Sequence, residues 1–183
     1  LAPIVRTALS DIQPRAERYL IAGIVTAQRV QNGRRGKVAF VTLDDGKGSA
    51  EVVVFGEVYD AARAMLREDA LVVIEVKVTV RMGDDGEVQG LRVLAEQVYD
   101  LGAVRRRWGK RLKVSCNGNA SADRLAEILT PFRSDGLPVV VHYVNGAFEG
   151  DVELSEAWRV TPDDALIARL ADWLAPENVQ VVY

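Results

Sequence analysis

The feature that most constrains this chain is the order of its extended and helical segments between residues 19 and 99. Alternating or β-branched apolar runs predict five strands, at residues 19–30, 37–43, 51–55, 71–81 and 87–99. Between the third and fourth strands the apolar residues change to helical spacing, at Val58, Ala61, Ala62, Met65 and Leu66. The predicted order is therefore three strands, one helix and two strands.

This order is what a small five-stranded Greek-key barrel of the OB type requires, with its helix between the third and fourth strands. The loops that join strands one and two, and strands four and five, flank the ligand face of such a barrel. The first of these loops carries the turn signal at residues 31–33 followed by Arg34-Arg35-Gly36, and the second, residues 82–86, is acidic. We therefore predict an OB-fold β-barrel with a basic loop beside its ligand face.

The rest of the chain predicts a small α+β domain. Ser121 is a candidate N-cap for a helix, and Thr161-Pro162-Asp163-Asp164 predicts a second helix capped by its threonine. Strands or extended pieces are expected at residues 137–144, 150–154, 158–160 and 179–183. The predicted division is a connector or the end of a preceding domain (1–18), the OB domain (19–102), a basic linker (103–113) and the α+β domain (114–183). Because the chain begins with Leu1, we expect it to be part of a longer protein.

Composition excludes several classes of function. The chain holds one cysteine and one histidine, which excludes internal disulfides, multi-cysteine zinc sites and catalysis that needs a second histidine. No run approaches the roughly 20 apolar residues of a membrane span, and no leader-like segment opens the chain. The formal net charge is -3, yet residues 105–113 contain six basic residues and no acid. Such basic islands favour local anion sites over general affinity for polyanions. No cofactor is expected.

Most candidate reactive groups have a simpler structural explanation. The pairs Asp44-Asp45 and Asp84-Asp85 are typical of turns, and Asp163-Asp164 is typical of a helix start, so a metal site is disfavoured. The alternating acids between residues 149 and 153 fit the solvated face of an edge strand. His142 is expected to be half-buried and hydrogen-bonded, and Cys116 to be inert. The segment Gly46-Lys47-Gly48-Ser49 lacks the spacing of a P-loop and is expected to be a turn.

One group of residues points to binding. Cations on the edge of an OB ligand face can follow a single-stranded backbone while aromatic rings stack on its bases. The candidates for this face are Arg29, Arg34, Arg35, Lys37, Phe40 and Phe55. Either phenylalanine could equally fill the barrel core, and the basic loop could simply be solvated. The basic run around Trp108 is likewise either a nucleic-acid contact or a solvated linker. Trp158 and Trp173 are expected in the core rather than at an interface.

Several strings resemble a known family. The OB domain of the bacterial DNA polymerase III alpha subunit is resembled by the strings Ala22-Gly23-Ile24-Val25, Arg29, Arg34-Arg35-Gly36, Thr42-Leu43-Asp44-Asp45, Glu51-Val52 and Val54-Phe55. Ala157-Trp158-Arg159-Val160-Thr161-Pro162, followed by a helix and a terminal strand, resembles the last domain of that subunit. The polymerase palm, the fingers and the phosphoesterase domain of the family are absent from this chain.

The resemblance implies a noncatalytic C-terminal fragment of a replicative polymerase, whose parent protein would be a DNA-directed DNA polymerase of the bacterial cytoplasm. It implies that the OB domain contacts single-stranded template DNA and that the last domain contacts the tau subunit of the clamp loader. The candidates for the tau contact are Trp173, Val179, Val181 and Tyr183. The rest of the alpha subunit is a further expected partner. Two alternatives stay open: a protein-interaction module whose barrel no longer binds nucleic acid, and a tRNA- or RNA-binding appendage.

Overall fold

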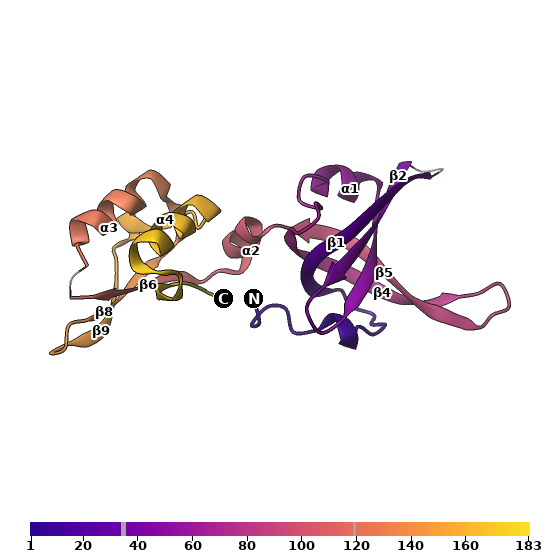
Figure 1. Ribbon diagram of the computed structural model, residues 1–183, viewed down its shortest axis with the longest axis horizontal. Coiled ribbons are helices and arrows are strands. Elements are labelled where there is room, and N and C mark those ends of the chain that lie inside the picture. Colours follow the sequence, from indigo (N-terminus) through magenta and orange to yellow (C-terminus); the bar gives the residue numbers. More distant parts are fainter. Residues whose placement is uncertain (34–35, 119) are drawn as a thin grey trace. The chain divides into compact units, whose positions relative to one another are not determined.

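The structure, a computed structural model, describes residues 1–33, 36–118 and 120–183. It divides into two compact units, Leu1–Leu101 and Gly102–Tyr183, each with its own hydrophobic core (Figure 1). No helix in these described ranges has the length and hydrophobicity needed to cross a bilayer. Each unit is described by itself below.

The first unit is a closed five-stranded barrel in the order β1-β2-β3-β5-β4. Its elements are η1 (Leu9–Asp11), β1 (Tyr19–Gly33), β2 (Gly36–Asp44), β3 (Ser49–Phe55), α1 (Gly56–Ala62), β4 (Leu71–Met82) and β5 (Val88–Tyr99). The pairing of β3 with β5 is parallel, and the other four pairings are antiparallel. The predicted OB-type barrel, with its helix after the third strand, is confirmed.

Alternation along the strands separates the barrel core from its outer face. In β2, Ala39, Val41 and Leu43 are fully buried, whereas the residues between them are partly exposed. β3 repeats the pattern with Val52 and Val54 inside. Because successive side chains of a strand point to opposite faces, the outward residues of β2 and β3 form one continuous surface.

The basic hairpin differs from its prediction. The sequence predicts an exposed loop over residues 31–36, but the β1–β2 ladder continues through Gln31↔Val38 and Asn32↔Lys37 to Gly33↔Gly36. Gly36 has a φ of 104°, a conformation that glycine adopts without strain. Arg34 and Arg35 lie outside the described residues. The sequence predicts a connector or the end of a preceding domain at residues 1–18, and in the structure Leu9 and Ile12 of this segment are buried in the barrel's hydrophobic cluster.

The second unit packs helices on one face of a four-stranded sheet of order β10-β6-β8-β9, in which only the β6–β8 pairing is parallel (Figure 1). Its elements are α2 (Leu101–Trp108), β6 (Arg111–Asn117), α3 (Ala122–Leu129), η2 (Thr130–Phe132), β7 (Arg133–Leu137), β8 (Val139–Val144), β9 (Glu149–Glu153), η3 (Glu156–Trp158), α4 (Asp164–Leu174), η4 (Pro176–Asn178) and β10 (Val179–Val182). Leu112 and Val114 on β6 pack with Leu125, Leu166 and Leu170 from α3 and α4. An α+β second domain is confirmed.

Two local predictions in this unit need correction. The sequence predicts a basic linker at residues 103–113, but the structure forms α2 and the start of β6 there, because Val104 and Leu112 are fully buried. The sequence also assigns the α4 cap to Thr161. Asp163 is the N-cap: its Oδ1 accepts a hydrogen bond of 2.8 Å from the Leu166 amide. The N-cap predicted for α3 is confirmed, since the Arg124 amide donates to Ser121 Oγ.

Candidate nucleic-acid interface

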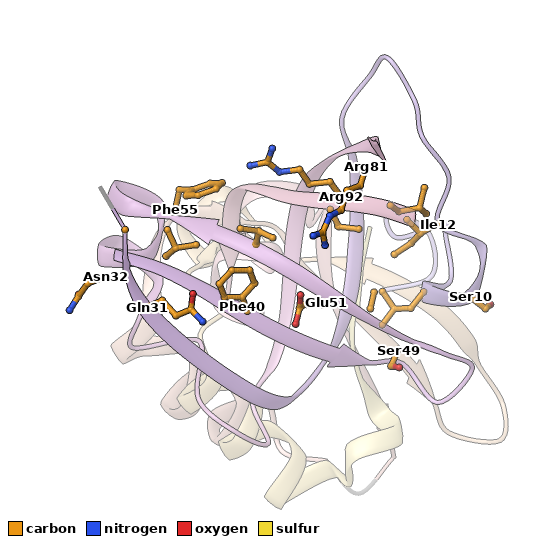
Figure 2. A pocket seen from close by; sticks show the side chains of 17 residues that line it. Ser10, Ile12, Gln31, Asn32, Phe40, Ser49, Glu51, Phe55, Arg81 and Arg92 are labelled. Carbon is orange, nitrogen blue, oxygen red and sulfur yellow. The ribbon is translucent and has the colours of Figure 1, made fainter. Parts of the chain in front are cut away.

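A groove of about 680 Å³ runs over the outer face of the barrel (Figure 2). All five strands and the N-terminal segment contribute to it. Its lining consists of Leu9, Ser10, Ile12, Gln31, Asn32, Gly33, Val38, Phe40, Ser49, Ala50, Glu51, Val53, Phe55, Arg81, Leu91, Arg92 and Val93. The groove therefore lies on the surface that alternation in β2 and β3 creates.

Both candidate phenylalanines line this groove and neither belongs to the barrel core (Figure 2). Phe55 has an exposed fraction of 38%, and Phe40 is half-buried on the outward side of β2. The Arg29 guanidinium lies 4.8 Å from the centre of the Phe40 ring, and that of Arg92 lies 5.7 Å from the Phe55 ring. The two aromatic rings are thus placed beside cations, where a flat ligand group could stack.

Of the four cations predicted for the ligand face, the structure places two beside the groove. Arg29 and Lys37 are exposed on β1 and β2, next to the groove lining. Arg34 and Arg35 belong to the same prediction and lie outside the described residues. Two further arginines, Arg81 and Arg92, line the groove and are not among the predicted cations, because the connection between their strands is acidic in the sequence. The signal that could have found them is alternation: each arginine stands on a strand flanking that acidic turn.

The charged side chains in and beside the groove have no ion-pair partner among the described residues. Among the residues that the structure describes, Arg29, Lys37, Arg81 and Arg92 form no ion pair, and neither does Glu51. Unpaired guanidinium groups can form charge-assisted hydrogen bonds with phosphate. The groove is therefore suited to a ligand that brings its own anionic groups.

Asp45 ties the N-terminal segment to one end of the groove. Its Oδ2 accepts a hydrogen bond of 2.8 Å from the Leu9 amide, and its Oδ1 accepts bonds from the Lys47 and Gly48 amides. These bonds, chiefly that from Leu9, lower the pKa of the Asp45 carboxyl. A Cβ atom at Gly48 would stand 2.9 Å from the Ser10 nitrogen, so the segment packs closely on this turn. The N-terminal residues thus form a fixed wall of the groove.

The residues predicted to contact tau differ in how far they belong to the core of the second unit. Val179 and Val181 pack against the core cluster, so their side chains serve the core. Trp173 packs on the same core and also lines a second groove of about 440 Å³ with Arg124 and Arg169. Tyr183 follows β10, and burial raises the pKa of its hydroxyl. β10 is an edge strand that pairs with β6, and among the described residues no strand pairs with its other backbone edge.

His142, Cys116 and the acids of β9 have ordinary structural surroundings. His142 is half-buried, with its Nδ1 2.6 Å from Asp151 Oδ1 and its Nε2 3.5 Å from Glu149 Oε1. Cys116 is buried, and desolvation raises the pKa of its thiol. β9, with its alternating acids, is an edge strand. Within the described ranges, no group of three or more histidine, cysteine or acidic residues is arranged to hold a metal ion.

Comparisons with known proteins follow the same division of the chain. The family "OB-fold nucleic acid binding domain" matches residues 19–101, and the family "DNA polymerase III subunit alpha, C-terminal domain" matches residues 124–174. The second OB-fold domain of replication protein A from Methanococcus maripaludis is similar with a TM-score of 0.38 and 16% identity, over 51% of this chain and 91% of that one. That likeness adds nothing to the topology already described.

Curated relatives extend over nearly the whole chain. The DNA polymerase III alpha subunit of Neisseria meningitidis serogroup A is 32% identical over 176 residues, which is 94% of this chain and 15% of that protein. The subunit of Escherichia coli K12 is 29% identical over 182 residues, which is 96% of this chain and 15% of that protein. The chain thus spans about 15% of the length of these relatives. The chain therefore corresponds to the C-terminal region of bacterial DNA polymerase III alpha subunits.

Proposed function

We propose that the barrel binds single-stranded DNA along the groove of its outer face. The observation that carries the proposal is the position of Phe40 and Phe55, which face outward into the groove with a guanidinium over each ring. A flat aromatic surface beside unpaired cations suits a strand whose bases are free to stack and whose phosphates need counter-charge. The match of residues 19–101 to an OB-fold nucleic-acid-binding family supports it.

The single strand is favoured over the duplex because the bases of a duplex already stack on one another and cannot reach isolated rings. The overall charge of -3 argues against strong, general attraction to DNA. Binding then depends on the local cations Arg29, Arg81 and Arg92, and we expect it to be weak and sensitive to salt.

Fluorescence anisotropy of the 183-residue chain with a labelled single strand and a matched duplex tests the proposal. We expect preference for the single strand and a negative slope of log affinity against log salt. Arg81→Ala/Arg92→Ala should weaken binding and flatten the slope by about 0.7 for each phosphate that the variant no longer neutralises. Arg63→Ala/Arg67→Ala, which removes two exposed arginines outside the groove lining, is the matched control. Absence of binding at low salt would overturn the proposal and favour a protein-interaction module.

We further propose that the second unit contacts the tau subunit of the clamp loader, and that the chain serves as a noncatalytic part of a replicative polymerase in the bacterial cytoplasm. The support is the match of residues 124–174 to the C-terminal domain of the alpha subunit. We expect the chain to co-elute with purified tau, and Trp173→Ala to reduce this more than Arg63→Ala does. A Trp173→Phe variant that keeps the core packed separates a weakened interface from a failure to fold. Failure of the parent chain to co-elute with tau would contradict the assignment.

A further inference from the structure

Glu51 is the one carboxylate among the described residues that line the groove. Glu51 is an exposed residue of β3, and it lines the groove together with Phe40, Arg81 and Arg92 (Figure 2). In the part of the chain that the structure describes, no cation pairs with it. The groove therefore offers unpaired charge of both signs.

A purely anionic ligand would satisfy the arginines but not Glu51. Phosphate oxygens only accept hydrogen bonds at neutral pH, so a phosphate next to this carboxylate would be repelled. An ionised carboxylate accepts hydrogen bonds and needs a donor. The edges of unpaired bases carry such donors, so a nucleic-acid strand can satisfy the arginines with its backbone and Glu51 with its bases.

The sheet register places Glu51 where a stacked base would present its edge. Phe40 pairs with Val53 across β2 and β3, and Thr42 pairs with Glu51. Phe40 and Glu51 are therefore diagonal neighbours on the same face, at a typical spacing of about 7–8 Å. A base lying flat on the Phe40 ring extends over its rim, within reach of the flexible glutamate side chain.

We infer that Glu51 gives the groove a preference among bases, selecting those with an exocyclic amino group over thymine. Cytosine and adenine each present an amino donor, and glutamate acceptance from the cytosine N4 amino group is an established pairing. Thymine offers only its ring N3–H, flanked by two carbonyl oxygens that repel a carboxylate. This inference rests on the proposed binding of single-stranded DNA.

Competition between homopolymers of about 15 nucleotides, within the span of an OB site, tests the inference. Oligo-dC and oligo-dT are matched pyrimidines with the same backbone, and neutral pH keeps cytosine unprotonated. We expect the 183-residue chain to bind oligo-dC about fivefold more tightly than oligo-dT. Glu51→Gln should abolish this difference, because an amide both donates and accepts and so pairs with either base. It should also raise the affinity for oligo-dT, since the variant removes a negative charge from the groove.

Glu68→Gln is the matched control, because it removes the same charge from an exposed glutamate that does not line the groove. It should keep the preference for oligo-dC. Equal binding of both homopolymers by the parent chain, or a preference that survives Glu51→Gln, would overturn the role of Glu51 while the proposed function stands. Absence of binding to either homopolymer at low salt would overturn both.

Discussion

At the residue scale, Asp45 links stability to pH. The hydrogen bonds that it accepts from the Leu9, Lys47 and Gly48 amides lower its pKa, so its stabilising effect is present above the ordinary carboxyl pKa of 3.8 and is lost as the pH falls through the lowered value. We expect Asp45→Asn to cost about 1 kcal/mol of barrel stability at neutral pH and less at about pH 3. Urea unfolding at both pH values measures this, with Asp84→Asn in an exposed turn as the control. A cost that does not change with pH would contradict the linkage.

The candidate site shows what could be predicted for single residues. Phe40, Phe55 and Arg29 could be found because each lies on a strand whose alternation is visible in the sequence. Whether the phenylalanines face outward could not be decided, since that depends on which face of each strand the barrel encloses. The sequence does not indicate the Asp45 contact with Leu9, because the two residues lie 36 positions apart and no local pattern links them.

At the scale of elements, the start of α4 depends on Asp163. Its side chain satisfies the Leu166 amide, whereas the Thr161 hydroxyl donates to Ser134 Oγ at 3.0 Å. We expect Asp163→Ala to destabilise the second unit by about 1 kcal/mol, and Asp163→Asn, an equally good cap, to restore most of it. Urea unfolding followed by tryptophan fluorescence measures the effect. Equal losses in the alanine and asparagine variants would show that the cap is not the cause.

Strands with a clear alternation of apolar and polar residues, such as β2 and β3, agree with their predictions. β6 shows why other segments do not. Its buried Leu112, Val114 and Cys116 alternate with outward residues, as a strand requires. The six basic residues just before and within it outweighed that alternation and suggested a solvated linker. The same reasoning shortened the β1–β2 hairpin, because a turn signal at residues 31–33 hid a ladder that continues to Gly33. In both places, charged or turn-forming residues conceal in the sequence the strand pairing that the structure forms.

At the scale of the whole molecule, two separate cores should unfold separately. All three tryptophans, Trp108, Trp158 and Trp173, lie in the second unit, whereas Leu43 is fully buried in the barrel core. We expect Leu43→Ala to destabilise the barrel by about 2–5 kcal/mol and to leave the tryptophan transition in place. Amide hydrogen exchange of the barrel strands supplies the second readout. A tryptophan transition that moves with the barrel would mean that the two units unfold as one.

The way the barrel closes has a consequence for its synthesis. β1 pairs with β4, and β3 pairs with β5, so the two closing seams join segments about 50 and 40 residues apart. The β1–β2–β3 meander can assemble from neighbouring strands, but the outer edge of β1 stays unpaired until β4 (Leu71–Met82) has been synthesised, and that of β3 until β5 (Val88–Tyr99) has been synthesised. Since distant strand pairings form slowly, closure belongs to the millisecond-to-second regime. A nascent chain paused before β5 would expose two unpaired strand edges. Because such edges can pair with other chains, a chaperone would be needed to cover them.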